Sequence, residues 1–126
     1  MQEDLRNRHK GKTGFTRIWN ALLYSLDGLA AAFRHEDAFR QEVVIALVLI
    51  PVALALPASG LGKAVMVASV LLVLIVELLN SAIESVMDRV SLEEHVLAKR
   101  AKDMGSAAVM LALINVPVVW LLVLLA

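Results

Sequence analysis

Three long apolar runs divide the chain, and a shorter amphipathic stretch precedes them. The apolar runs occupy residues 39–57, 64–87 and 106–126. About 20 apolar residues in a helix cross the roughly 30 Å hydrocarbon layer of a bilayer. Each run is long enough, although the first needs residues 39–42 as its entry and contains Pro51, which neighbouring helices can accommodate. The pattern therefore predicts three transmembrane helices.

The stretch before the first run, residues 14–35, has apolar side chains at spacings of three and four. These side chains are Phe15, Ile18, Trp19, Leu22, Leu26, Leu29 and Phe33. Such spacing places them on one face of an α-helix, and Trp19 and Tyr24 suit the headgroup zone of a membrane. We expect an amphipathic helix lying in the membrane interface, although a helix facing the core of a soluble bundle has the same pattern. Residues 1–13 are expected to form a flexible N-terminus.

Composition supports a membrane protein of a single domain. The chain is 60% hydrophobic, with a mean hydropathy of +0.76, above the roughly 45–50% apolar content of soluble domains. It has no net charge, with 12 Lys and Arg against 12 Asp and Glu, so nothing favours nucleic-acid binding. Cysteine is absent, which excludes thiolate metal sites and cysteine nucleophiles. The predicted fold class is therefore an all-α membrane protein.

The distribution of basic residues predicts the orientation in the membrane. Of the 12 Lys and Arg residues, seven precede Val43, one is Lys63 in the turn after the first run, and four lie between the second and third runs. Eleven of them thus fall on one side, which the positive-inside rule makes cytoplasmic. We expect the N-terminus in the cytoplasm and the C-terminus outside, with the acidic residues at or near the cytoplasmic face.

A polar stripe interrupts the second apolar run at helical spacing. Glu77, Asn80, Glu84 and Asp88 share one face of a helix, and the stripe rises by roughly 16 Å from its first to its last member. A carboxylate at membrane depth is costly unless it faces protein, water or a cation. These side chains suit Mg²⁺ ligands and a general base, with snorkelling or a pair with Arg89 as the alternative.

Two charged segments flank this stripe in the predicted topology. Residues 99–103, with the sequence KRAKD, come just before the third run and suit the phosphates of a nucleotide, or membrane anchoring alone. Glu36 precedes the first run, near Arg40 and Glu42, and is either a Mg²⁺ ligand or the partner of Arg40 in a surface ion pair.

The chain has no P-loop motif. Gly11-Lys12-Thr13 lacks the glycine that a P-loop needs five residues earlier, where Arg6 stands. Any ATP chemistry therefore proceeds without a P-loop.

Three spans cannot shield all the side chains of the polar stripe from lipid, so we expect a homo-oligomer with sites at helix interfaces.

Several of these segments carry a family resemblance. They are Gly14–Arg17 (GFTR), Ala38–Glu42 (AFRQE), Val76–Glu84 (VELLNSAIE), Asp88–Arg89 (DR) and Arg100–Ala108 (RAKDMGSAA). With these strings, nearly all of the chain after Lys12 resembles the small integral-membrane diacylglycerol kinases of Gram-negative bacteria. The resemblance implies a homotrimer of three-span subunits in the bacterial inner membrane. It also implies Mg²⁺-dependent transfer of the γ-phosphate of ATP to a lipid hydroxyl, which makes phosphatidic acid from diacylglycerol.

The resemblance further implies roles for single residues. Glu77 looks like the general base, and Glu36 with Glu84 looks like the Mg²⁺ pair. The residues expected at ATP are Arg17, Tyr24, Glu36, Glu84, Glu93, Glu94, His95, Lys102 and Asp103. The residues expected at the lipid substrate are Arg17, Glu77, Ser106 and Trp120. Asn80 and Asp88 are expected to support the site.

Two other functions fit the residues. An undecaprenol kinase would use the same chemistry on a polyprenol, since nothing in the apolar runs separates acyl from prenyl chains. Carboxylates within the membrane also occur in small proton-coupled transporters, which would need no ATP.

Overall fold

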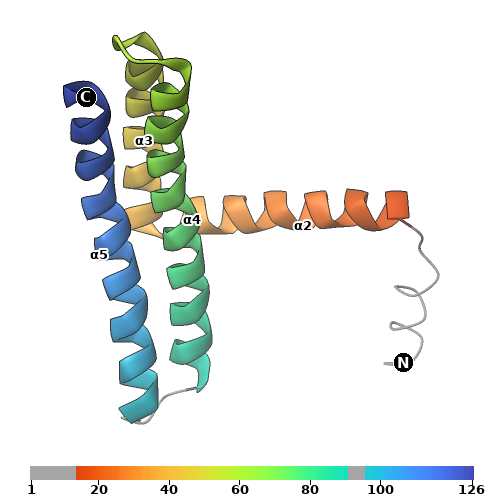
Figure 1. Cartoon of the computed structure of the whole chain (residues 1–126). Coiled ribbons are helices and arrows are strands. Elements are labelled where there is room, and N and C mark those ends of the chain that lie inside the picture. Colours follow the sequence, from red (N-terminus) through yellow and green to blue (C-terminus); the bar gives the residue numbers. More distant parts are fainter. Residues whose placement is uncertain (1–13, 91–95) are drawn as a thin grey trace.

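Four helices make up the part of the chain that the structure describes, residues 14–90 and 96–126 of a computed structural model (Figure 1). They are α2 (Gly14–His35), α3 (Asp37–Ala55), α4 (Gly60–Val90) and α5 (Val96–Leu125). The last three run side by side as a bundle, whereas α2 projects sideways from the level at which α3 begins. No strand occurs in the described ranges, so the predicted all-α class is confirmed.

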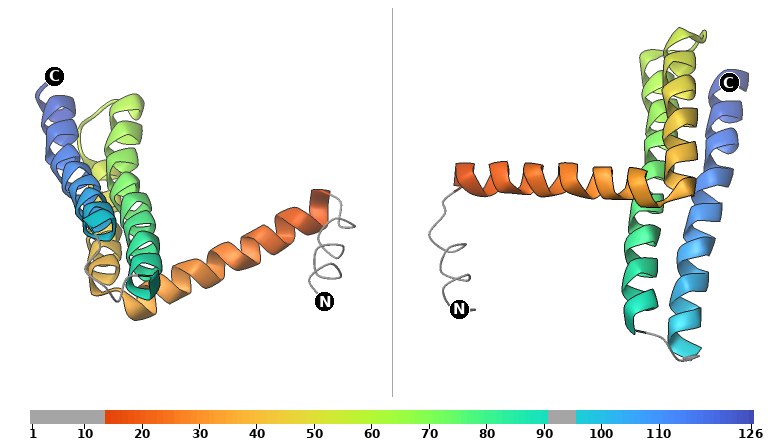
Figure 2. Two further views of the ribbon diagram at one scale, coloured as in Figure 1. Left: turned by 90° about the horizontal axis from the view of Figure 1, so that it is seen from below. Right: turned by 180° about the vertical axis from the view of Figure 1, so that it is seen from behind.

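Three of these helices are long and apolar enough to cross a membrane. The most apolar windows of α3, α4 and α5 have mean hydropathies of 1.9, 2.3 and 2.7. The helices also extend beyond the apolar runs, since α4 continues to Val90 and α5 already begins at Val96. The charged segments before and after residues 91–95 are therefore helical, and they lie beyond the level of α2 (Figure 2).

Helix α2 leaves its apolar stripe uncovered. Phe15 is 86% exposed and Trp19 is 55% exposed, and Ala32 is the residue of α2 that is buried. Contacts of α2 with α3 and α4 are few compared with those inside the bundle, as its sideways course in Figures 1 and 2 suggests. A soluble bundle would have buried the stripe, so this arrangement favours the predicted helix in the membrane interface.

Small residues dominate the interior of the bundle. Ala46, Ala53 and Ala112 are buried, and Met66 is the largest fully buried side chain in the described residues. Small residues let helix backbones approach closely, and such approach drives helix association in membranes through van der Waals contact. Most large apolar side chains of the bundle remain exposed, as expected for helices that face lipid or another subunit.

The end of the bundle near the α3–α4 turn is tied by a small hydrogen-bond network. The indole Nε1 of Trp120 donates to Ser69 Oγ at 3.1 Å and to the carbonyl of Met66 at 3.3 Å, and Ser69 Oγ donates to the same carbonyl at 2.6 Å. Next to it, Ser59 Oγ caps α4 by accepting from the Gly62 amide at 3.0 Å. Helices α4 and α5 are thus fixed to each other at the end remote from the polar stripe.

Shortening Met66 tests this packing. We expect Met66→Ala to lower the free energy of unfolding in mixed micelles by about 2 kcal/mol. This loss is near the low end of the range for truncating a buried methionine, because moving an apolar side chain from lipid into protein adds little stability. Leu122→Ala, at a side chain that is 68% exposed, is the matched control and should cost clearly less. Equal losses would show that the burial of Met66 does not stabilise the bundle.

Candidate active site

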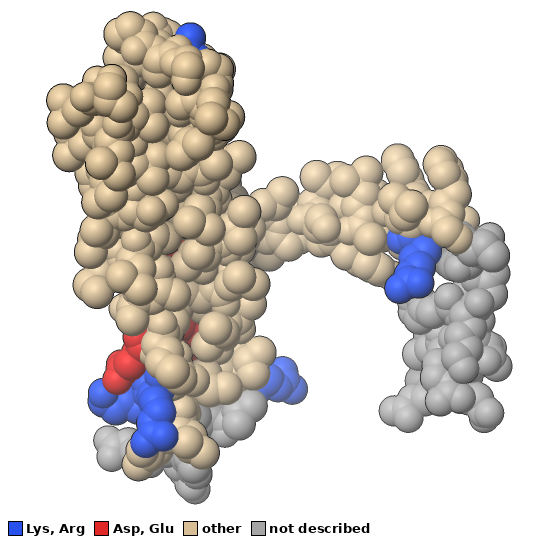
Figure 3. All heavy atoms as spheres, viewed as in Figure 1, with Lys and Arg blue, Asp and Glu red and all other residues tan. Residues whose placement is uncertain are grey.

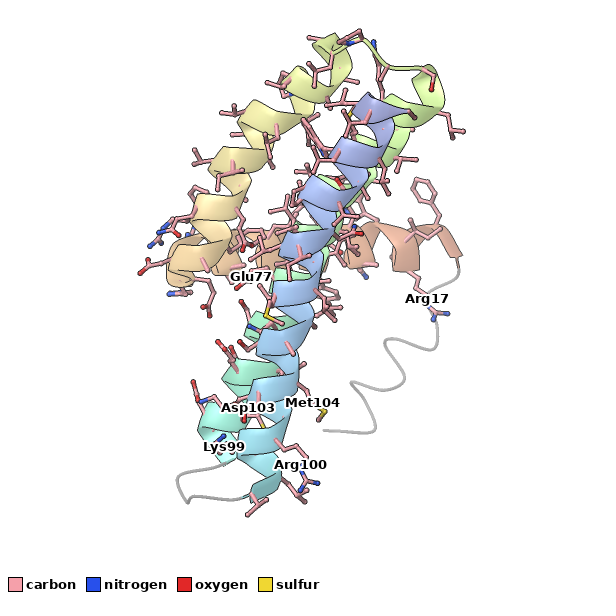
Figure 4. The ribbon with its side chains drawn as sticks, turned by 60° about the vertical axis from the view of Figure 1, so that its left-hand side comes forward. Arg17, Glu77, Lys99, Arg100, Asp103 and Met104 are labelled. Carbon is pink, nitrogen blue, oxygen red and sulfur yellow. The ribbon has the colours of Figure 1, made fainter. Side chains whose placement is uncertain are left out.

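The polar stripe of α4 passes from the interior of the bundle to its charged end. Glu77 is 6% exposed and Asn80 is 8% exposed, while Glu84 is partly exposed and Asp88 is exposed. Because Glu77 and Asn80 are buried by other parts of the same chain, the carboxylate of Glu77 does not point into lipid. Figure 4 shows Glu77 well separated along the bundle from Lys99, which lies near the start of α5.

Side-chain hydrogen bonds connect the middle of the stripe. Nδ2 of Asn80 donates to Oε1 of Glu84 at 3.4 Å. Oδ1 of Asn80 is buried against α5 and has no hydrogen-bond partner among the described residues. The amide therefore links the buried part of the stripe to the partly exposed carboxylate one turn later.

Ion pairs hold the charged end of the stripe. Nζ of Lys102 lies 2.8 Å from Oδ1 of Asp88 and thereby joins α5 to α4, and Nζ of Lys99 lies 2.6 Å from Oδ2 of Asp103. The carboxylate of Glu84 is also within electrostatic range of Lys102. Exposed pairs of this kind add little stability, so these cations can exchange their partners for phosphate.

Glu36 stands between α2 and α3 and is not the ion-pair partner of Arg40. Arg40 instead forms a salt bridge with Asp37 and donates to the carbonyls of Phe33 and Arg34 at 3.0 and 2.8 Å. Glu36 is the N-cap residue of α3, but its side chain makes no capping hydrogen bond. Of the two alternatives for Glu36, the ion pair with Arg40 is therefore wrong. The carboxylate of Glu36 remains available to bind another group.

Two other carboxylates lie within electrostatic range of Glu77. The carboxylates of Glu84 and Glu36 are both close enough to Glu77 to repel it. No group of three His, Cys, Asp or Glu side chains in the described ranges could hold a metal ion by itself. Mg²⁺ commonly takes only one or two protein carboxylates and completes its shell with water and substrate phosphates. Two carboxylates, of which Glu84 lies within electrostatic range of Lys102, fit that mode of binding.

Glu42 is a carboxylate of this region to which the sequence analysis assigned no role. Its Oε2 is buried and has no hydrogen-bond partner among the described residues. It lines a cavity of about 180 Å³ between α3, α4 and α5 and lies within electrostatic range of Glu77. Val73, which precedes Glu77 by one turn of α4, lines the same cavity. Glu42 lies at the entry of its apolar run, where a carboxylate is ordinarily solvated, so the rule that singled out Glu77 within a run did not mark it.

Other predicted site residues lie far from this cluster within one chain. Arg17 is at the outer end of α2 (Figure 4), and at about 1.5 Å per residue roughly 28 Å of helix separates it from Glu36. Tyr24, on the same helix, is 64% exposed. Ser106 is exposed, and Trp120 follows it by roughly 21 Å along α5.

Glu93, Glu94 and His95 lie outside the described residues, as does the N-terminal segment 1–13. The structure thus brings together Glu36, Glu77, Asn80 and Glu84, with Asp88, Lys102 and Asp103 at the exposed end.

Comparison with known proteins identifies the family. The sequence model described as prokaryotic diacylglycerol kinase matches residues 23–124. The chain belongs to this family. A diacylglycerol kinase from Pseudomonas aeruginosa is 60% identical over 116 residues, which cover 92% of this chain and 94% of that protein. Relatives of the same name from Escherichia coli and Haemophilus influenzae are 50% and 49% identical, over 89% and 86% of this chain and 92% of each relative. The resemblance to the diacylglycerol kinases is confirmed.

Replacing the carboxylate of Glu42, which has one buried oxygen, tests its environment. An unpaired carboxylate within a membrane protein destabilises it, so we expect Glu42→Gln to raise the free energy of unfolding in micelles by about 1 to 3 kcal/mol. Asp27→Asn, on the exposed α2, is the control and should leave stability unchanged. A loss of stability in Glu42→Gln would instead show that the carboxylate is bound by a cation or donor.

Proposed function

We propose that this member of the diacylglycerol kinase family transfers the γ-phosphate of ATP to the hydroxyl of diacylglycerol, making phosphatidic acid at the cytoplasmic face of the membrane. The observation that carries the proposal is the stripe on α4, which joins a buried carboxylate to exchangeable cations. A lipid hydroxyl needs a base below the membrane surface, and a nucleotide needs cations above it. The stripe of α4 offers the base, and Lys102 of α5, which pairs with Asp88 at the exposed end of the stripe, offers a cation.

Glu77 is the proposed general base. Its carboxylate is buried in the bundle. In this proposal the lipid headgroup approaches it from the membrane, and the phosphates of the nucleotide approach from the exposed end of the stripe. In the proposed reaction, the hydroxyl oxygen attacks the γ-phosphorus, its proton passes to Glu77, and ADP leaves. Ser106, on the exposed surface of α5, is proposed to contact the same lipid, together with Arg17 and Trp120.

Glu36 and Glu84 are the proposed ligands of Mg²⁺, which they would share with the phosphates of ATP. Bound there, the ion would neutralise charge on the phosphates during transfer. Lys102 supplies a cation close to Glu84, provided that it exchanges Asp88 for phosphate. The remaining proposed ATP contacts are Arg17, Tyr24, Glu93, Glu94, His95 and Asp103.

The proposed orientation places the charged ends of α4 and α5 in the cytoplasm of a bacterial cell, with the bundle in the inner membrane. Figure 3 shows Lys and Arg side chains gathered at that end of the bundle, beside acidic ones, below a broad uncharged surface. The positive-inside rule supports this orientation, with the C-terminus on the periplasmic side.

An assay of the purified protein in mixed micelles tests the activity. We expect ATP- and Mg²⁺-dependent formation of phosphatidic acid from diacylglycerol. We also expect Glu77→Gln to lower turnover by about 100-fold or more, because general-base catalysis contributes at least that factor. Asp27→Asn, a carboxylate change remote from the stripe, should retain normal turnover.

Each outcome of this assay has a defined meaning. Near-normal turnover of folded Glu77→Gln would refute the role of Glu77, and absence of phosphatidic acid with the wild-type chain would refute the activity. Faster turnover on undecaprenol than on diacylglycerol would reassign the lipid substrate.

We further infer a homotrimer in which each active site is shared between subunits. Two observations support shared sites. Arg17 lies at the outer end of α2 (Figure 4), and at about 1.5 Å per residue roughly 18 Å of helix separates Tyr24 from Glu36, so neither side chain reaches Glu77 of the same chain. Ser81 is buried with an Oγ that has no partner among the described residues, and it lines a groove of about 550 Å³ between α2 and α4. Small residues such as Gly28 and Ala82 line the same groove and suit close approach of another helix.

Mixing two impaired variants tests shared sites. Arg17→Ala and Glu77→Gln disable opposite sides of a shared site, so randomly mixed oligomers should regain about a quarter of the wild-type turnover, from sites with both sides intact. The measurement is phosphatidic acid formation after the unfolded variants are refolded together. The matched control mixes each variant with itself. Activity no higher than the sum of these controls, or a fully active Arg17→Ala, would overturn the inference.

A further inference from the structure

Gly105 lies where α5 crosses the polar stripe of α4, and a side chain of the stripe fills the space that a Cβ would need. Gly105 is buried. A Cβ built on it would lie 2.2 Å from Oδ1 and 3.3 Å from Cγ of Asn80. By contrast, Gly14, Gly28 and Gly60 have nothing within 4 Å of such an atom. Gly105 therefore leaves room for one particular group, the side-chain amide of Asn80.

The amide of Asn80 can take only one orientation in this space. Its Nδ2 faces Oε1 of Glu84 at 3.4 Å. Turning the amide over would place Oδ1 against the carboxylate oxygen, which puts two acceptors together. The donor thus faces Glu84 and Oδ1 faces Gly105, although Oδ1 is left without a partner among the described residues. Packing against α5, rather than a hydrogen bond to Oδ1, holds the amide in place.

We propose that Gly105 is a positioning residue for the metal-binding carboxylate. Because it lacks a side chain, the Asn80 amide can sit between the helices and hold one oxygen of Glu84, which leaves the other oxygen directed to a cation. This inference rests on the proposed role of Glu84 in holding Mg²⁺. Groups that orient a metal ligand commonly change metal affinity or activity by about 10- to 100-fold when they are altered.

A purely structural glycine would behave differently, and the chain contains a matched example. Gly62 lies at the opposite end of the same helix pair, where an added Cβ would meet Cγ1 of Val123 at 2.8 Å. Both positions are tight contacts between α4 and α5, but one meets a methyl group and the other meets the Asn80 amide. Gly62→Ala therefore controls for crowding of the two helices.

The test measures cation binding as well as turnover. Binding of Mn²⁺, a spectroscopic substitute for Mg²⁺, is followed by electron paramagnetic resonance with a non-hydrolysable ATP analogue. The Mg²⁺ concentration for half-maximal activity is measured in parallel. We expect Gly105→Ala to weaken Mn²⁺ binding, and to raise the Mg²⁺ concentration needed for half-maximal activity, by about 10-fold or more. We expect Gly62→Ala to lower stability and to leave both quantities unchanged. Equal cation dependence in Gly105→Ala and wild type would overturn the proposal.

The double variant Asn80→Ala/Gly105→Ala separates positioning from folding. Asn80→Ala removes the atoms that the new Cβ would meet, so the double variant should fold even if Gly105→Ala alone does not. If Gly105 acts through Asn80, adding Gly105→Ala to Asn80→Ala changes cation binding less than twofold. Independent, multiplying losses would overturn the proposal.

Glu84→Gln distinguishes this inference from the proposed function. If Glu84→Gln binds Mn²⁺ and nucleotide as the wild type does, the metal role of Glu84 fails and the inference fails with it. If Glu84→Gln loses cation binding while Gly105→Ala keeps it, only the inference about Gly105 fails.

Discussion

The structure depends on one constraint, which is that a carboxylate beneath the membrane surface must face protein or water rather than lipid. Helix α4 meets this constraint by turning Glu77 and Asn80 into the bundle. Small residues on the neighbouring helices, Ala46 on α3 and Gly105 on α5, allow the close approach that encloses them. Because α4 and α5 continue past the level of α2, the same polar face then emerges among charged side chains. One helix face thus runs from the interior of the bundle to its charged end.

The pair of helices α4 and α5 is built differently at its two ends. Near the α3–α4 turn, the indole of Trp120 is bonded to Ser69 and to a backbone carbonyl, and Val123 packs on Gly62. At the other end, exposed ion pairs connect side chains that can find other partners. The rigid end fixes the register of the two helices, and the register decides that Gly105 meets Asn80. The charged end can therefore remain polar, with ion pairs that can exchange partners, without loss of alignment between the two helices.

Much of the fold follows from local patterns, because a membrane imposes strict requirements on each segment. Apolar runs long enough to cross the bilayer predicted three spans, and the described part of the chain contains three such helices. The spacing of Glu77, Asn80 and Glu84 predicted a shared face. The burial of both Glu77 and Asn80, and the hydrogen bond from Asn80 to Glu84, agree with this prediction. The close approach of Gly105 was not predictable, since it depends on the register of two helices, which no local pattern encodes. Glu42 was missed for a different reason. It lies at the entry of its run, where a charged residue is ordinarily solvated, and only the packing of three helices shows that its oxygen is enclosed.

A single chain of this protein buries few of its own side chains. Its large apolar side chains, along α2 and around the bundle, lie mostly on the outside, so acyl chains and neighbouring copies provide contacts that a soluble protein obtains from its own core. Part of the tertiary structure is therefore supplied by the surrounding medium. For such a protein, a change of detergent chain length or bilayer thickness acts on folding in the way that a core substitution acts on a protein in water.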